Sequence, residues 1–129
     1  NDGTMMEPRL IRNVTSPAGV QRLGFTSKVY RQACTPELAA KVETYMKDVV
    51  QRGTGKSAAV DGLSIAGKTG SAEGSIDGRY VTHAWFVGYI TNDNAPYAIS
   101  VLVENGGSGG GVAAPLARKT LQKAINLGL

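Results

Sequence analysis

The chain has 129 residues, of which 42% are hydrophobic, and its formal net charge is +4. This length fits one domain or part of one, and the composition excludes a disordered or low-complexity chain. No apolar run approaches the ~20 residues that cross a bilayer. Residues 1–4 indicate a turn rather than a signal peptide.

Most of the excess positive charge lies in residues 1–34, where five bases stand against two acids. A nucleic-acid surface needs more bases with aromatic residues between them, and only Phe25 and Tyr30 are available here. No nucleic-acid partner is therefore expected. The single cysteine, Cys34, cannot form an internal disulfide and is expected to be a small buried side chain. His83 is the only histidine and has no cluster of carboxylates, so no metal and no cofactor are expected.

The first 25 residues predict a small hairpin. Residues 8–15 have the pattern of a strand, and residues 20–25 return as a second strand. The four residues between them form a turn, because Pro17 suits its second position and Gly19 its end. Basic side chains along the strands would discourage the addition of strands from other chains.

A helix is predicted from Pro36 to the glycine at position 53. Thr35 can cap it, proline is favoured at its first position, and Glu37 complements its N-terminal dipole. Apolar residues recur at helical spacing and are expected to be core: Leu38, Val42, Tyr45, Met46 and Val49.

Residues 53–57 (Gly-Thr-Gly-Lys-Ser) are similar to the end of a phosphate-binding loop. The first glycine of that motif would fall on Val50, and the segment follows a helix, whereas the motif follows a strand. We therefore interpret it as the end of the helix and not as a phosphate site.

The second half predicts an antiparallel meander. Strands are expected at residues 63–73, 83–90 and 97–104, with a loop at 74–79 and a turn at 92–96. The strand at 83–90 is apolar and aromatic enough to be buried on both faces. A glycine-rich loop at 105–111 precedes a helix at 112–127, which would pack on one face of the sheet through Ala113, Leu116, Ala117, Leu121, Ala124 and Ile125. The fold class is therefore α+β, with a three-stranded meander, a C-terminal helix, an N-terminal hairpin and one further helix.

The segment Gly67-Lys68-Thr69-Gly70-Ser71-Ala72-Glu73 lies on the first strand of this meander. Its lysine supplies a positive charge and its threonine a hydroxyl donor, while Gly70 would let a ligand lie against the backbone. Glycines also make this a poor interior strand, and such a local conflict is expected at a functional site. The pattern fits a site that binds a carboxylate, and the alternative is an ordinary exposed strand end with one lysine and a turn glycine.

Taken together, several segments resemble the transpeptidase domain of penicillin-binding proteins, in particular the C-terminal part of the class B, monofunctional type. The resemblance extends over nearly the whole chain, in the family's order, and rests on residues 1–8, 53–55, 67–73, 83–89, 103–107 and 113–115. The family uses three motifs, S-x-x-K, S-x-N and K-T-G. Only the third occurs here, because no lysine has a serine three positions before it and no asparagine has one two positions before it.

The resemblance implies roles for four positions. Lys68 and Thr69 would bind the terminal carboxylate of a D-Ala-D-Ala stem peptide or of a β-lactam. Gly70 would let the ligand pair with the strand edge. The backbone N–H of Ser71 would be one of two oxyanion-hole donors, the other belonging to the nucleophilic serine. No catalytic side chain is expected in this chain, which alone would be inactive and would need the rest of the domain for acyl transfer through a serine ester.

The resemblance also implies a context. Residues 1–129 would be an incomplete domain that begins after the two absent motifs, in a bacterial envelope protein at the outer face of the cytoplasmic membrane. The family's sheet has five strands, so the apolar face of this part would be exposed. The missing N-terminal part, or a swapped copy of the chain, is expected to cover it.

Two other readings remain open. Serine β-lactamases and β-lactam-sensing domains share the K-T-G motif and the fold, and the deacylation rate would distinguish them from a transpeptidase. The second alternative is a non-catalytic module that only binds a peptide or holds a partner subunit.

Overall fold

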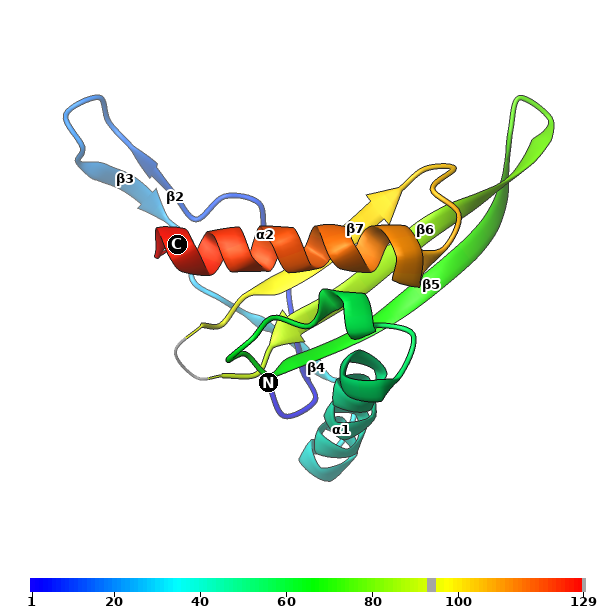
Figure 1. Cartoon of the computed structure of the whole chain (residues 1–129). Coiled ribbons are helices and arrows are strands. Elements are labelled where there is room, and N and C mark those ends of the chain that lie inside the picture. The colour runs from blue at the N-terminus through cyan, green and yellow to red at the C-terminus, as the bar shows by residue number, and fades with distance from the viewer. Residues whose placement is uncertain (93–94, 129) are drawn as a thin grey trace. The chain divides into compact units, whose positions relative to one another are not determined.

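The computed structural model describes residues 1–92 and 95–128. The chain forms two compact units, Asn1–Lys41 and Val42–Leu129. Figure 1 shows the elements in chain order from the N-terminus in blue to the C-terminus in red.

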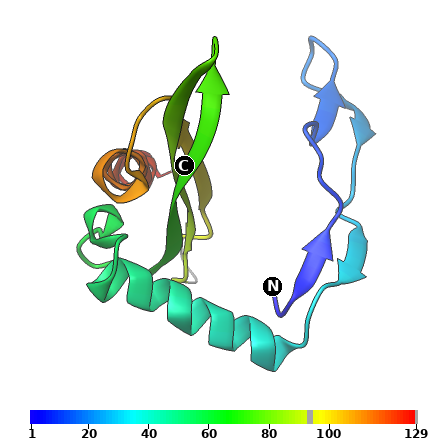
Figure 2. The same cartoon turned by 90° about the vertical axis from the view of Figure 1, so that its right-hand side faces the viewer.

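The first unit consists of two short antiparallel strand pairs, which lie end to end in Figure 2, and in the sequence one pair falls between the two strands of the other. Strand β1 (Thr4–Met6) pairs with β4 (Val29–Gln32), and β2 (Asn13–Thr15) pairs with β3 (Gln21–Gly24). The predicted hairpin is confirmed, including its turn, where the Gly19 N–H donates to the Ser16 carbonyl at 2.9 Å. The β1–β4 pair was not predicted.

The predicted strand at 8–15 is too long, because only its last three residues pair with β3. Pro8 has no N–H to give to a strand pair. Residues 8–12 are not part of a strand, although the Phe25 N–H donates to the Arg12 carbonyl at 3.2 Å and the side chain of Arg9 donates to the Phe25 carbonyl at 2.5 Å. Cys34 is half-buried rather than fully buried.

Helix α1 (Pro36–Arg52) begins and ends where the sequence predicts. The Leu38 N–H donates to Thr35 Oγ1 at 3.3 Å, which confirms the cap. The predicted core stripe is wrong for Leu38, Val42 and Tyr45, which are exposed, and Val50 is the fully buried residue of the helix. The earlier turns of α1 therefore present apolar side chains that are about half exposed.

The second unit is built on one antiparallel sheet, in the order β5–β6–β7. Its strands are β5 (Ile65–Ile76), β6 (Arg79–Ile90) and β7 (Ala98–Val103), which confirms the meander. The predicted loop at 74–79 is wrong: both strands continue to a two-residue turn at Asp77 and Gly78, which both have positive φ. An Asp-Gly pair suits this tight hairpin turn. The predicted turn at 92–96 includes residues 93–94, which lie outside the described residues.

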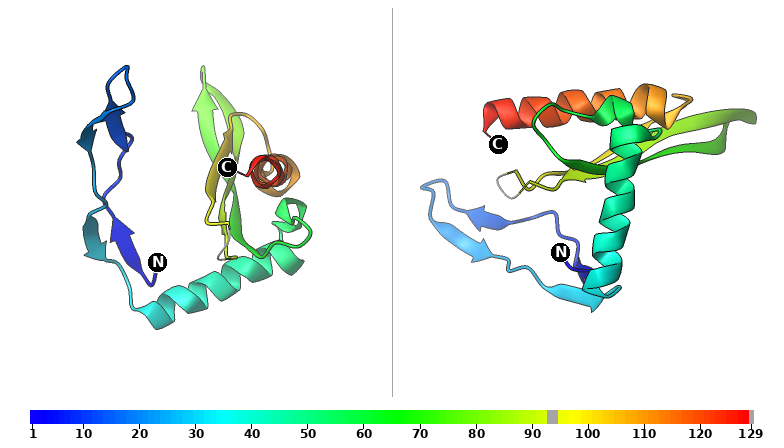
Figure 3. Two further views of the ribbon diagram at one scale, coloured as in Figure 1. Left: turned by 90° about the vertical axis from the view of Figure 1, so that its left-hand side faces the viewer. Right: turned by 60° about the horizontal axis from the view of Figure 1, so that its bottom comes forward.

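Helix α2 (Ala114–Leu127) crosses one face of this sheet, as both views in Figure 3 show. A π-helical turn, η2 (Gly109–Ala113), leads into it, so the last three residues of the predicted loop at 105–111 belong to this turn. The core between helix and sheet contains Phe86, Ala84, Ile90, Ala113, Ala114, Ala117 and Leu121. Of the predicted stripe of this helix, Leu116 is exposed.

The other face of the sheet is largely uncovered. Trp85, Val87 and Leu102 are 37%, 43% and 45% exposed, and they alternate with residues on the covered face. The expectation that residues 83–90 are buried on both faces is therefore wrong for this part of the chain. None of the described helices is both long and apolar enough for a membrane span.

Candidate functional site

The candidate site lies on β5, which is one of the two edge strands of the three-stranded sheet. The Thr91 N–H donates to the Ser64 carbonyl at 2.8 Å, so the residue pair beside the start of β5 is hydrogen-bonded. Pairs in an antiparallel ladder alternate between bonded and non-bonded. The uninterrupted register therefore makes Lys68–Val87 and Gly70–Trp85 bonded pairs, and Thr69–Phe86 and Ser71–Ala84 non-bonded pairs.

This alternation decides which backbone groups are free. The N–H and C=O of Thr69 and Ser71 point away from β6, toward the open edge of the sheet. An extended ligand placed along this edge can pair with them as an additional strand. In the same register, the backbone groups of Lys68 and Gly70 are used within the sheet.

The side chains of Lys68 and Thr69 leave the strand on opposite faces. Lys68 is exposed, and its ammonium donates to the carbonyl of Thr69, which places the positive charge at the open edge. Thr69 is on the covered face and only 8% exposed. The residues predicted from the sequence thus meet at one stretch of edge, with a cation, a hydroxyl and two outward-facing amide N–H groups.

Sequence reasoning missed Thr54 as a member of this site. Its Oγ1 lies 2.6 Å from Oγ1 of Thr69, and it comes from the turn between α1 and the short 3-10 helix η1 (Lys56–Ala58). In sequence, residues 53–57 have the pattern of a helix end, which hides this contact. The available signal was the presence of residues 53–55 among the segments that carry the family resemblance.

The start of η2 packs directly against the site strand. The Gly109 N–H donates to Oγ of Ser71 at 3.3 Å. A Cβ on Gly109 would lie 2.4 Å from the carbonyl oxygen of Gly70 and 2.5 Å from that of Trp85, so only glycine fits this approach. The glycine-rich segment therefore supports the back of β5 and has a structural reason for its composition.

A hydrogen bond joins α1 to the sheet near the site. The Tyr89 hydroxyl donates to Oε2 of Glu43 at 3.2 Å, and Lys47 forms an ion pair with the same carboxylate at 2.8 Å. The hydrogen bond from Lys47, aided by that from Tyr89, lowers the pKa of Glu43. Burial, with a smaller contribution from the Glu43 charge, raises the pKa of Tyr89. This contact fixes the helix whose C-terminal end leads into Thr54.

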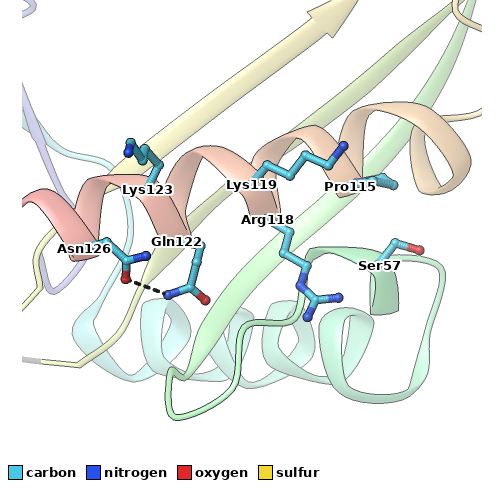
Figure 4. A pocket seen from close by; sticks show the side chains of 7 residues that line it. All are labelled: Ser57, Pro115, Arg118, Lys119, Gln122, Lys123 and Asn126. Carbon is cyan, nitrogen blue, oxygen red and sulfur yellow. Dashed lines mark hydrogen bonds between the residues drawn. The ribbon is translucent and has the colours of Figure 1, made fainter.

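A groove of about 560 Å³ lies along exposed residues of α2, away from these positions. Figure 4 shows Arg118 of α2 and Ser57 of η1 on its two sides, with Lys119 and Lys123 on the helix. None of Lys68, Thr69, Gly70 or Ser71 lines it. The described residues contain no group of three or more side chains suited to hold a metal ion.

The family model described as "Penicillin binding protein transpeptidase domain" matches residues 1–122. The chain therefore belongs to the penicillin-binding protein transpeptidase family, as the sequence resemblance indicated.

Individual relatives are bacterial. The chain is 34% identical to peptidoglycan D,D-transpeptidase PbpA of Mycolicibacterium smegmatis, over 99% of this chain and 27% of that protein. It is 31% identical to PbpA of Mycobacterium tuberculosis, over 97% of this chain and 26% of the relative. The chain thus spans about a quarter of the length of these curated relatives.

Solved structures show the same fold. A ceftriaxone acyl-enzyme complex of penicillin-binding protein A from M. tuberculosis matches 97% of this chain and 29% of that one, with a TM-score of 0.82 and 32% identity. The D,D-transpeptidase domain of a peptidoglycan glycosyltransferase from Eggerthella lenta matches 98% of this chain and 29% of that one, with a TM-score of 0.80 and 31% identity. The α+β fold predicted from the sequence is confirmed.

Proposed function

We propose that this chain forms the substrate-binding edge of a peptidoglycan D,D-transpeptidase that acts by serine acyl transfer. The observation that carries the proposal is the open edge of β5, where the Lys68 ammonium and the outward backbone groups of Thr69 and Ser71 meet. The names of the relatives support the same activity.

Each of the four residues has a role in this proposal. Lys68 and Thr69 bind the carboxylate at the end of a D-Ala-D-Ala stem peptide, or the carboxylate of a β-lactam. A Cβ at position 70 would meet only Trp85, at an ordinary 3.4 Å, so packing within the chain does not require glycine there. In this proposal Gly70 instead keeps the strand flat for the ligand. The N–H of Ser71 donates to the oxyanion as the tetrahedral intermediate forms, and the loss of one such donor typically costs ~10²–10³ in rate.

The nucleophile and its base come from outside these residues in this proposal, because no S-x-x-K or S-x-N occurs in the sequence. Residues 1–129 are then part of a larger catalytic domain, and the isolated chain is inactive. The complete protein belongs in the bacterial cell envelope, where its substrate lies at the outer face of the cytoplasmic membrane.

Labelling with a fluorescent penicillin tests the function. The natural full-length protein should become covalently labelled, and the labelled peptide should map to a serine outside residues 1–129. A slow release of the label is expected of a transpeptidase, and rapid release would indicate a β-lactamase. A labelled serine within residues 1–129 would contradict the assigned roles.

The Lys68→Ala variant tests the binding edge. It removes the cation that faces the ligand carboxylate, and a charge-assisted contact contributes roughly 1.5–3 kcal/mol. The acylation rate should therefore fall by about 10- to 100-fold. The matched control is Lys123→Ala, since Lys123 lies on α2 and lines the other groove; equal rates for Lys68→Ala and the wild type would reject the role of Lys68.

A further inference from the structure

The hydroxyls of Thr54 and Thr69 lie close enough to act as one hydrogen-bonding pair. The two Oγ1 atoms are 2.6 Å apart. Thr69 is 8% exposed, whereas Thr54 is exposed to solvent. Each hydroxyl donates one proton and accepts up to two. One proton is used between the two oxygens, so one remains for a ligand.

The turn that carries Thr54 is held in place by its backbone. The N–H groups of Gly53 and Gly55 both donate to the Val49 carbonyl, at 3.1 and 3.0 Å, and Gly55 is buried. A Cβ on Gly110 would lie 2.5 Å from the Thr54 carbonyl oxygen, so η2 also contacts this turn closely. The turn that carries the Thr54 hydroxyl is thus held by hydrogen bonds to the end of α1 and by close contact with η2.

The direction of the hydrogen bond follows from the chemistry of the ligand. An ionised carboxylate only accepts hydrogen bonds. If Thr69 binds it, Thr69 must donate its own proton to the ligand, and the bond between the two threonines must then run from Thr54 to Thr69. A hydroxyl that already accepts a hydrogen bond is polarised and becomes a stronger donor.

We propose that Thr54 is a positioning residue for the carboxylate site: it donates to Thr69 and directs the Thr69 proton toward the ligand. This inference rests on the proposed function. It assigns the recognition of the carboxylate to a pair of hydroxyls from two separate segments of the chain, one on the site strand and one at the end of α1.

The role predicts a specific kinetic pattern. Thr54 acts on the binding of the carboxylate and not on the attacking group. The Thr54→Val variant, which keeps the shape and loses the hydroxyl, should raise KM for a carboxylate substrate by about three- to tenfold, the range for one lost hydrogen bond. The kcat should stay near that of the wild type. Thr54→Ser, which keeps the hydroxyl, should restore KM.

The test compares acids with esters in the natural full-length protein. Acylation is measured with a penicillin and with its carboxyl methyl ester, for the wild type, Thr54→Val, Thr54→Ser and Thr120→Val. Thr120 is the matched control, because its hydroxyl donates to the Leu116 carbonyl on α2. At low substrate concentration we expect Thr54→Val to slow acylation about three- to tenfold with the acid and less with the ester, whose neutral carbonyl is a weaker acceptor. Thr54→Ser and Thr120→Val should match the wild type with both. An equal loss with acid and ester, no loss with the acid, or no rescue by serine would overturn the inference.

A second measurement separates this inference from the proposed function. If penicillin does not acylate the wild type, the proposed function fails, and the side chain of Thr69 is then compared in crystal structures of the wild type and Thr54→Val. Without Thr54 as its partner, the buried Thr69 hydroxyl should rotate away from position 54. An unchanged Thr69 side chain would overturn the positioning role regardless of activity.

Discussion

Phe86 shows how single residues hold the site strand in register. It is fully buried, and its ring lies where a Cβ on Gly67 would be 2.4 Å from Cζ. The glycine before Lys68 therefore provides space for an aromatic ring from the neighbouring strand. The same ring approaches Gly88, so the packing of Phe86 accounts for two of the glycines in the sheet.

Gly67→Ala should destabilise the protein through this contact. The ring must shift or the strands must separate, and overpacking of this kind costs roughly 1–3 kcal/mol. Chemical denaturation measures the loss in the free energy of unfolding. Gly111→Ala is the matched control, because its nearest neighbour would be 3.6 Å from the new Cβ. Equal stability of the two variants would contradict the packing role of Gly67.

Tyr89→Phe should remove the hydrogen bond to Glu43 and lower stability near neutral pH by about 1 kcal/mol. The exposed side chain of Tyr80 supplies the control, and Tyr80→Phe should leave stability unchanged. Unfolding by urea, followed across pH, measures both variants.

The contribution of Glu43 to the free energy of unfolding depends on pH in a definite direction. The pKa of Glu43 is lowered in the folded state, first by the hydrogen bond from Lys47 and then by Tyr89, so its contribution is present above about pH 4.3 and lost as pH falls through the folded pKa. The Tyr89→Phe variant removes one of the hydrogen bonds that lower the pKa of Glu43. The stability difference between wild type and variant should therefore narrow as the pH falls through the lowered pKa of Glu43, and a constant difference at all pH values would contradict this account.

At the scale of elements, the β5–β6 hairpin depends on its two-residue turn. Asp77 and Gly78 have φ values of 50° and 74°, and a Cβ on Gly78 would meet nothing within 4 Å. Gly78→Ala therefore tests backbone strain without a steric clash, and we expect a loss of roughly 1–2 kcal/mol in the free energy of unfolding. Asp77→Asn should be neutral, because asparagine tolerates this conformation. No loss in Gly78→Ala would contradict the turn geometry.

The elements that the sequence predicts well are those with local signals. Helix α1 has a capping threonine, a proline at its first position and a terminal glycine, and all of these concern neighbours in the chain. The meander was predicted because short connections favour antiparallel pairing. The hairpin turn was missed although Asp77-Gly78 is a strong local signal, because the glycines and polar residues around it were interpreted as a loop.

What the sequence did not predict depends on distant contacts. The β1–β4 pair joins segments about 25 residues apart and has no turn signal of its own. The strand that carries Lys68 and Thr69 was found from its motif, but the contact between Thr69 and Thr54 requires the packing of two elements. Burial was also misjudged, since apolar spacing on α1 and β6 indicates a face that can be covered and does not say what covers it.

At the scale of the whole chain, the uncovered face of the sheet predicts self-association. Trp85 and Leu102 are paired across β6 and β7 and lie on this face with Val87. Exposed apolar patches of this kind mark an interaction surface. We expect the 129-residue chain alone to form oligomers in light scattering, and Leu102→Lys to shift it toward the monomer. A wild-type chain that is monomeric at high concentration would contradict this expectation.

The most direct test of the central claim is a crystal structure of the natural full-length protein acylated by a penicillin. The account predicts that the ligand carboxylate lies against Lys68 and Thr69, that the ligand backbone runs along the open edge of β5, and that its carbonyl oxygen accepts from the Ser71 N–H. A ligand bound away from β5, or attached to a serine within residues 1–129, would contradict it.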